Sequence, residues 1–255
     1  MSGRNFDDLA GRFKSNIYGT RKGQLRLDLL WEHIEQELLP LLYSEHGDVT
    51  VFDAGCGMAQ ISKRLIQSGC QITLCDKSIK MLNQAKSEIG ESVHCEFIHA
   101  SFQDMHADYR EYFDLVMSHA VLEWLDKPED GINALGRSCK PGGYLSLLFY
   151  NRDSYVFRNL IRGNWKKVES NDYTGHRGGL TPNNPVSQTE VLSWLESAGF
   201  VALDTIGLRS FFDYMSKEMQ LNREYEDILR LERMYSRVSP YRDMARYIHI
   251  IARKL

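Results

Sequence analysis

The pattern of apolar and polar positions changes once along the chain. Between residues 4 and 44 the apolar positions recur about every 3.6 residues, which predicts an amphipathic N-terminal helix; they include Leu25, Leu29, Leu30, Ile34, Leu38 and Leu42. Short runs of Val, Ile, Leu and aromatic residues then take over, each followed by turn or cap residues: "VTVFDAG", "CQITLCD", "VHCEFIHA", "FDLVMSHA" and "GGYLSLLFYN". Because most of these runs are separated by helix-like stretches, they predict parallel βαβ units and a doubly wound α/β sheet.

This regular pattern breaks after Asn151. The segment that follows is interrupted by glycines and prolines, namely Gly163, Gly175, Gly178, Gly179, Pro182 and Pro185. Ordinary connections between elements are much shorter, and long inserts usually form lids or binding loops. We therefore expect residues 151–187 to form an insert of helix and loop that covers the substrate.

Regular elements return after the insert. The pattern predicts a helix over Gln188–Ala198, a strand over Phe200–Ile206, a charged helical stretch over Ser216–Tyr235 and a closing strand, "RYIHIIARK". We expect one domain over residues 1–255, made of a helical cap (1–45), a cofactor-binding half (49–150), the insert, and a C-terminal part (188–255) that completes the sheet.

Composition narrows the class of protein. A chain of 255 residues with 43% hydrophobic and 25% charged residues is typical of a soluble globular protein. The start, "MSGRNFDDLAGRF", lacks the apolar region of a signal peptide, and no later window has 18 uninterrupted apolar residues. We expect a cytoplasmic protein without a membrane span. The five cysteines include no C-x-x-C pair and no zinc-finger spacing, so we expect free thiols and no metal site.

The turn "DAGCG" follows the first predicted strand, where an open parallel sheet binds its ligand. Gly55 and Gly57 would let the backbone approach that ligand closely. Three hypotheses compete: a nicotinamide dinucleotide, S-adenosylmethionine, or a reactive thiol at Cys56. The unpaired cysteines disfavour the thiol, and Gln60 stands where the dinucleotide fingerprint requires a third glycine. Asp76, after the second strand, can accept both hydroxyls of an adenosine ribose, which both cofactors carry.

The acid Asp53 before the glycines, Asp76 and the segment "SFQD" together resemble the class I S-adenosylmethionine-dependent methyltransferases, over Val49–Phe149. The resemblance implies a Rossmann-like, mostly parallel sheet with an antiparallel closing strand, and S-adenosylmethionine as the cofactor. It also implies the cofactor contacts: Asp53, Gly55, Cys56 and Gly57 at the turn, Asp76 on the ribose, Phe102 and Gln103 at the adenine, and His119 beside the sulfonium.

Four further segments, "RNFDDLAGRFKSNIYGTRKGQLRLDLLW", "SHAVLEWL", "PGGYLSLLFYN" and "FFDYM", are similar to the bacterial tRNA 5-carboxymethoxyuridine methyltransferases. This resemblance spans almost the whole chain. It implies methyl esterification of the carboxylate on a modified wobble uridine, the tRNA anticodon arm as partner, and a cofactor contact by Arg26.

Methylation of a carboxylate does not require an acid or a base from the protein. A carboxylate is already ionised at pH 7, so no general base is required, and catalysis would rest on alignment, with His119 and Tyr150 as positioning residues. Arginine can hold a carboxylate or phosphate with two hydrogen bonds, and a splayed base can stack on an aromatic ring. We therefore expect substrate contacts after the fifth strand, at Tyr150, Arg152, Tyr155 and Arg158.

Charge is unevenly distributed along the chain. The net charge is −3, but Arg152–Arg177 holds six basic and three acidic residues, which leaves +3 there and −6 elsewhere. We expect Lys166, Lys167 and Arg177 to contact RNA phosphates; the alternative is a solvated polar loop. Two other functions remain open at this point: a methyltransferase of a free small carboxylic acid, and a non-catalytic cofactor-binding partner protein. A dehydrogenase is the least favoured.

Overall fold

The structure is a computed structural model, and it describes residue 7 and residues 19–45, 47–90, 94–105, 109–171, 173 and 182–255. The predicted N-terminal helix covers residues 4–44, and its part before residue 19 lies outside the described residues, except for residue 7. Arg177 also lies outside them.

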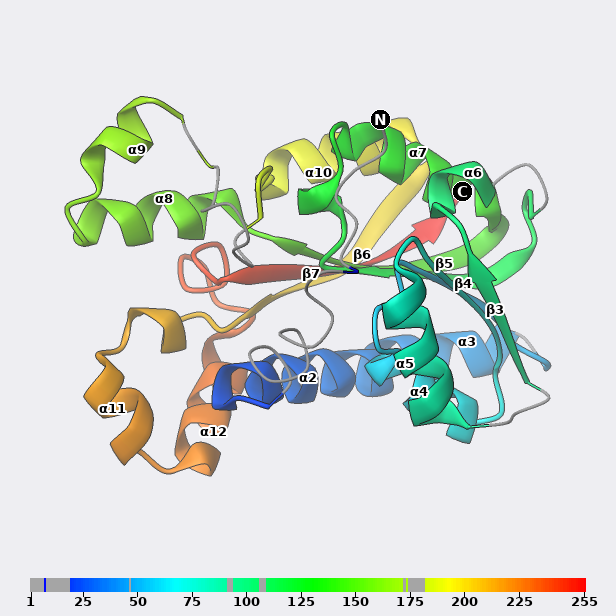
Figure 1. The fold of residues 1–255 in the computed structure, drawn as a ribbon, viewed down its shortest axis with the longest axis horizontal. Helices are drawn as coiled ribbons and strands as arrows, with labels where there is room; N and C mark the ends of the chain where they lie inside the picture. The colour runs from blue at the N-terminus through cyan, green and yellow to red at the C-terminus, as the bar shows by residue number, and fades with distance from the viewer. Residues whose placement is uncertain are drawn as a thin grey trace.

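Seven strands form one sheet in the order β3-β2-β1-β4-β5-β7-β6 (Figure 1). Their bounds are β1 Thr50–Ala54, β2 Gln71–Asp76, β3 Cys95–His99, β4 Phe113–His119, β5 Cys139–Tyr150, β6 Phe200–Leu208 and β7 Tyr247–Lys254. Strands β1 to β5 pair in parallel, and β7 runs antiparallel to its neighbours β5 and β6. The predicted doubly wound, mostly parallel sheet with an antiparallel closing strand is confirmed.

Alternate residues of these strands fill two apolar cores, one on each face of the sheet. Helices α2 (Arg21–His33), α4 (Gln60–Gln67), α5 (Ile79–Ile89) and α12 (Tyr225–Tyr235) supply the core that contains Leu74 and Ile251. Helices α6 (Phe102–Met105), α7 (Pro128–Ser138) and α10 (Gln188–Ser197) supply the core that contains Phe52 and Ile250. Burial on both faces explains why the parallel strands read as nearly continuous apolar runs.

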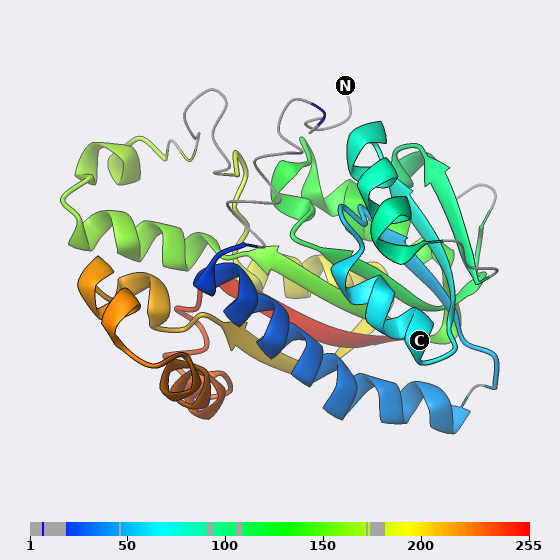
Figure 2. The same cartoon turned by 60° about the horizontal axis from the view of Figure 1, so that its bottom comes forward.

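The N-terminal helix lies along one face of the sheet, as Figure 2 shows. It begins with α2, where the Thr20 side chain accepts a hydrogen bond from the Gly23 N–H at 3.2 Å. It continues through a π-helical stretch, η2 (Ile34–Leu38), into α3 (Leu39–Glu45). This path carries residues of α2 past the ends of the central strands.

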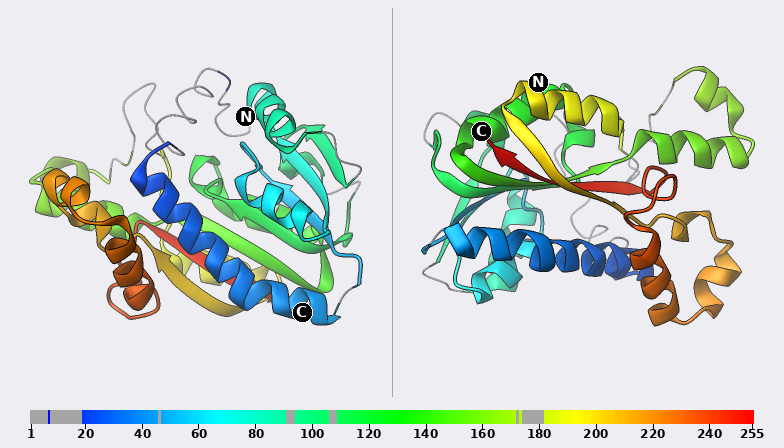
Figure 3. Two further views of the ribbon diagram at one scale, coloured as in Figure 1. Left: turned by 90° about the horizontal axis from the view of Figure 1, so that it is seen from below. Right: turned by 180° about the vertical axis from the view of Figure 1, so that it is seen from behind.

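The segment after β5 begins with regular helix. Helix α8 (Arg152–Ile161) starts directly after the strand and is followed by α9 (Trp165–Glu169); together they project beyond the sheet (Figure 3). Asn151 anchors this arm because its side chain accepts a hydrogen bond from the Asp153 N–H and donates to the carbonyls of Asp243 and Ala245. The glycines that predict loop structure begin only at Gly163, after the first of these helices has ended.

The predicted helical stretch Ser216–Tyr235 is two helices, α11 (Lys217–Asn222) and α12. Arg223 and Glu224 between them have extended backbone, and Arg21 contacts the end of the first helix. Its guanidinium donates hydrogen bonds to the carbonyls of Gln220, Leu221 and Arg223 at 2.6, 3.3 and 2.8 Å, and so satisfies carbonyl groups at the end of α11.

Glu232 on α12 fixes the segment that follows β6. Its buried carboxylate accepts hydrogen bonds from three consecutive backbone N–H groups, those of Ser210, Phe211 and Phe212, at 2.6, 3.2 and 2.9 Å. These bonds hold the short 3-10 helix η4 (Phe212–Tyr214) beside the end of the sheet.

We expect Glu232→Gln to lower the free energy of unfolding by roughly 1–3 kcal/mol, because the amide nitrogen of Gln cannot accept hydrogen bonds from buried N–H groups. Glu226→Gln on the exposed face of the same helix is the control, with an expected change within about 0.5 kcal/mol. Urea denaturation of the two variants measures the difference, and equal midpoints would contradict this role for Glu232.

Candidate active site

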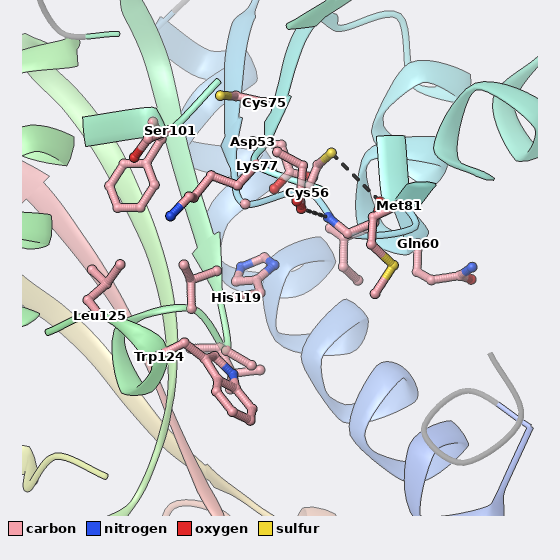
Figure 4. A pocket seen from close by; sticks show the side chains of 18 of the residues that line it. Asp53, Cys56, Gln60, Cys75, Lys77, Met81, Ser101, His119, Trp124 and Leu125 are labelled. Carbon is pink, nitrogen blue, oxygen red and sulfur yellow. Dashed lines mark hydrogen bonds between the residues drawn. The ribbon is translucent and has the colours of Figure 1, made fainter. Parts of the chain in front are cut away.

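A cavity opens at the carboxyl ends of β1, β2 and β4, where the strand order reverses and α2 passes by (Figure 4). It brings together all the residues predicted to bind a cofactor: Arg26, Asp53, Gly55, Cys56, Gly57, Asp76, Phe102, Gln103 and His119. A cavity at this reversal is the common ligand site of open α/β sheets.

The glycine turn is tightly tied to the second strand. The N–H groups of Gly55 and Cys56 both donate to the Cys75 carbonyl, at 2.9 and 3.0 Å. Gly55 has a φ of +83°, and a Cβ atom there would lie 2.6 Å from the Cγ2 atom of Val121. Only glycine fits both this backbone conformation and this contact, which keeps the turn close to the cavity.

Asp76 connects the same turn to the helix after β2. Its carboxylate accepts hydrogen bonds from the Gly57 N–H at 2.9 Å and from the Ser78 N–H at 2.7 Å. Burial raises the pKa of Asp76, and these two hydrogen bonds oppose the rise. The carboxylate is therefore held in one orientation at the wall of the cavity.

Asp53 is buried behind the turn, where its carboxylate accepts a hydrogen bond from the Ser62 hydroxyl. Burial raises the pKa of Asp53 to about 7; the Ser62 hydrogen bond opposes the rise, and the negative charge of Asp76 adds to it. A positive charge nearby would favour the ionised form of both acids. The two carboxyl groups thus make this part of the cavity suited to a cationic occupant.

Aromatic and basic groups also line the cavity. Phe102 and Gln103 begin α6, and Arg26 reaches the cavity from α2, with its guanidinium 5.3 Å from the ring centre of Tyr247. His119 ends β4, and its Nε2 atom lies 2.9 Å from the Ser146 hydroxyl. Burial and the charge of Arg26 lower the pKa of His119 to about 3, so its imidazole is neutral at pH 7.

A second cluster lies past the end of β5, next to Arg26. Tyr150 is buried, its ring packs edge-on against Tyr247 at 5.5 Å, and the guanidinium carbon of Arg246 lies 4.3 Å from its ring centre. In the described part of the chain, three buried polar atoms of this cluster have no hydrogen-bond partner: Tyr150 Oη, Arg158 Nε and Arg246 Nη1.

This cluster also carries an excess of positive charge. Arg209 is buried in an ion pair with Asp213, with hydrogen bonds of 2.7 and 2.6 Å. Burial lowers the pKa of Lys22, and the charges of Arg209, Arg246 and Arg158 lower it further, while Asp213 opposes them. Four cationic groups therefore surround one carboxylate, and three polar atoms remain unsatisfied. We call Lys22, Tyr150, Arg158, Arg209 and Arg246 the cationic cluster.

The structure separates the remaining predicted substrate residues. Arg152 forms an ion pair with Glu190 of α10, with nitrogen–oxygen distances of 2.8 and 3.0 Å. Tyr155 is buried between the rings of Tyr150 and Tyr173. Lys166 and Lys167 lie on α9, outside the residues that line the cavity.

Sequence reasoning missed several residues of the site. Arg246, Arg209 and Lys22 belong to the cationic cluster, and the arginine at the start of "RYIHIIARK" was a usable signal for the first. Glu123 is buried in the short 3-10 helix η3 (Leu122–Trp124); burial raises its pKa to about 7, and its Oε2 atom has no partner among the described residues. A single acid within the apolar run "VLEWL" was the signal for Glu123.

The thiol hypothesis for Cys56 is not supported. All five cysteines are free, and burial together with the charges of Asp53 and Asp76 raises the pKa of Cys56 well above its usual value. A reactive cysteine requires a lowered pKa. Among the described residues, no group of three His, Cys, Asp or Glu side chains could hold a metal ion, and no described helix is long and apolar enough to cross a membrane.

Solved structures show the same fold. A putative S-adenosylmethionine-dependent methyltransferase from Listeria monocytogenes aligns over 89% of this chain and 98% of its own, with a TM-score of 0.62 and 17% identity. The magnesium protoporphyrin IX methyltransferase of Synechocystis PCC 6803, solved with bound SAH, aligns over 98% and 96%, with a TM-score of 0.62 and 14% identity.

Sequence comparison goes further. The family model described as a methyltransferase domain matches residues 52–147. The tRNA 5-carboxymethoxyuridine methyltransferase of Escherichia coli K12 is 38% identical over 257 aligned positions, which cover 100% of this chain and 97% of the relative. Identity of this extent over nearly the whole of both chains shows that the protein belongs to the tRNA 5-carboxymethoxyuridine methyltransferase family.

Proposed function

We propose that the protein transfers the methyl group of S-adenosylmethionine to the carboxylate of 5-carboxymethoxyuridine at the wobble position of tRNA, forming the methyl ester. The observation that carries this proposal is the cationic cluster with its unpaired buried atoms, which Tyr247 links to the cofactor cavity by contacting both Tyr150 and the cavity residue Arg26. Buried donors without partners are unfavourable unless a ligand satisfies them, and an anionic ligand also balances the charge.

The cavity fits the methyl donor. Asp76 would accept the ribose hydroxyls, Phe102 and Gln103 would contact the adenine, and Arg26 would pair with the carboxylate at the methionyl end. The close backbone at Gly55 and the two buried acids suit a ligand that carries positive charge. When bound, S-adenosylmethionine supplies an electrophilic methyl carbon on a sulfonium.

The cationic cluster would hold the acceptor carboxylate. Arg158 and Arg246 would bind its oxygens, and the buried Tyr150 hydroxyl would donate a further hydrogen bond. The carboxylate is already ionised at neutral pH, so the residues orient it and exclude water rather than remove a proton. His119 stays neutral and adds no positive charge beside the cationic donor.

The arm formed by α8 and α9 would bind the anticodon arm of the tRNA, in the cytoplasm. Lys166 and Lys167 supply positive charge, and Arg177, outside the described residues, would extend it. Three apolar side chains of the arm are exposed: Phe157, Ile161 and Trp165, at 41, 55 and 62%. Exposed rings next to basic residues are typical of surfaces that stack unpaired bases.

The direct test is methyl transfer from S-adenosylmethionine to tRNA that carries 5-carboxymethoxyuridine, followed by mass spectrometry of the nucleosides. We expect the methyl ester on tRNA and much slower reaction with the free nucleoside. Equal rates on both would favour the free-acid methyltransferase, and donor binding without turnover would favour the non-catalytic partner protein.

The raised pKa of Asp53 predicts how donor binding depends on pH. A cationic ligand favours ionised Asp53, so its affinity should rise as pH passes upward through about 7. From about pH 6 to about pH 7.5 the gain should reach up to about eightfold. Calorimetry of S-adenosylmethionine binding measures this gain, and Asp53→Asn should remove the part of it that Asp53 contributes. An affinity that does not change with pH in the unmodified protein would contradict a cation next to Asp53.

The cationic cluster predicts a separation between donor and acceptor. Arg158→Gln and Arg246→Gln should each lower kcat/KM for tRNA by roughly 10-fold to 100-fold, because each removes a hydrogen bond to a charged group. Donor affinity should not change. Arg152→Gln is the matched control, since its guanidinium is already paired with Glu190. A larger loss in the control than in the cluster variants would show that the acceptor is bound elsewhere.

The salt dependence of tRNA binding tests the arm. For single-stranded RNA the logarithm of the binding constant falls with the logarithm of salt concentration by ~0.7 per phosphate contact. Replacing Lys166 and Lys167 by alanine should reduce that slope by one to two contacts. A double variant of Lys63 and Lys86, on α4 and α5 at the other end of the sheet, removes the same charge and should leave it unchanged (Figure 1). Identical slopes for both double variants would mean that α9 is only a solvated surface.

A further inference from the structure

A row of polar side chains crosses the apolar core between α2 and the sheet. His119, Ser146, His249 and Asp204 belong to the neighbouring strands β4, β5, β7 and β6, and His33 reaches them from α2. Ser146 and His249 are fully buried and His33 is 3% exposed, among the residues Leu148, Ile206 and Ile251 of the same core. Polar groups at such positions are costly unless each is hydrogen-bonded.

Each member of this row is bonded to the next. His119 Nε2 lies 2.9 Å from Ser146 Oγ, and Ser146 Oγ lies 2.8 Å from His249 Nε2. His249 Nδ1 lies 2.7 Å from His33 Nδ1, and His33 Nε2 lies 3.0 Å from Asp204 Oδ2. We call these five residues the histidine relay. It runs from the cofactor cavity to Asp204 on the edge strand, where Arg237 binds the same carboxylate.

Asp204 and the number of protons on each imidazole ring together set the direction of every hydrogen bond in the relay. The bond from His33 holds the pKa of Asp204 well below its usual range, so the carboxylate only accepts. With a single ring proton, His33 carries it on Nε2, toward Asp204, and accepts at Nδ1. His249 must then donate from Nδ1 and accept at Nε2.

The hydrogen bonds of Ser146 extend the relay to the cavity. The Ser146 hydroxyl donates to His249 Nε2, so its oxygen accepts from His119. His119 must therefore carry its proton on Nε2. The ring nitrogen of His119 that remains for an occupant of the cavity is Nδ1, as a hydrogen-bond acceptor.

We infer that the histidine relay is a positioning device: Asp204, at the edge of the sheet, fixes His119 as the tautomer whose Nδ1 atom accepts a hydrogen bond from the ligand in the cavity. This inference rests on the proposed function for the identity of that ligand. The group of S-adenosylmethionine that suits an acceptor is its ammonium, at the same cationic end as the sulfonium. His33, His249 and Ser146 act through His119 and do not touch the ligand.

A backbone hydrogen bond beside Asp204 makes it possible to test the direction of the relay. The Thr205 N–H donates to Asp204 Oδ1 at 2.7 Å. In Asp204→Asn, this bond retains an oxygen at the Oδ1 position and so places the amide NH2 group opposite His33 Nε2. A donor at that position reverses every bond of the relay, and His119 then presents an Nδ1–H group to the cavity.

Arg237 would oppose that amide orientation, because it also donates to Asp204 Oδ2. The test therefore uses Arg237→Gln as the parent and compares it with the double variant Arg237→Gln, Asp204→Asn. The parent retains the carboxylate and is the matched control. Ser146→Ala is a second variant, which cuts the relay without altering either end.

Proton–nitrogen correlation spectra of protein with ¹⁵N-labelled histidine distinguish the two neutral tautomers. We expect the Nε2–H form of His119 in the unmodified protein and in the Arg237→Gln parent, the Nδ1–H form in the double variant, and a mixture in Ser146→Ala. S-adenosylmethionine affinity should fall about tenfold in the double variant, while KM for tRNA stays unchanged.

Two results would overturn the inference: a His119 that is Nδ1–H or doubly protonated in the unmodified protein, or a double variant whose His119 tautomer and donor affinity match the parent. Failure of the proposed function looks different. The tautomers and donor affinities would then follow the expected pattern, but the unmodified protein would form no methyl ester on tRNA that carries 5-carboxymethoxyuridine.

Discussion

The carboxylate of Asp76 is the point on which the geometry of the site depends. By accepting hydrogen bonds from Gly57 and Ser78, it joins the turn after β1 to the start of α5 after β2. Ser78 in turn caps α5 by accepting a hydrogen bond from the Met81 N–H, so hydrogen bonds connect the turn, the strand end and the helix. These bonds preorganise the cavity wall on this side, and preorganisation reduces the ordering that ligand binding must impose.

The site has two parts that favour ligands of opposite charge. Asp53 and Asp76 favour positive charge in the cavity, and the cationic cluster favours negative charge beyond β5. Arg26 lies between them, in contact with the cavity and stacked near Tyr247. Under the proposed function, a cationic methyl donor and an anionic acceptor would therefore bind at adjacent places, which is the arrangement that in-line transfer between them requires.

The sequence predicts the cofactor half well because its signals are local. A buried strand, a glycine turn and an acid at the next strand end are all visible in "VTVFDAG" and "CQITLCD", and parallel pairing brings the strand ends together. The cationic cluster is different. Lys22, Arg158, Arg209 and Arg246 come from four distant segments, and no spacing along the chain shows that they meet. The contacts at the end of α11 are equally non-local, since Arg21 makes them from the other end of the chain.

The histidine relay also consists of contacts between residues that are distant in the sequence, so sequence patterns do not predict it. In the sequence, His33 and His249 look like core residues on an apolar helix and an apolar strand, and a direct Nδ1 to Nδ1 contact between them is invisible. That contact requires one ring to donate and the other to accept. A third group must therefore determine which of the two Nδ1 atoms carries the proton. In our inference this group is Asp204, because a carboxylate can only accept a hydrogen bond from His33. Asp204 lies on the edge strand, where Arg237 and solvent stabilise its charge. We thus infer that one half-buried carboxylate on β6 sets the hydrogen-bonding character of His119 on β4, across the two intervening strands β7 and β5, without adding a buried net charge.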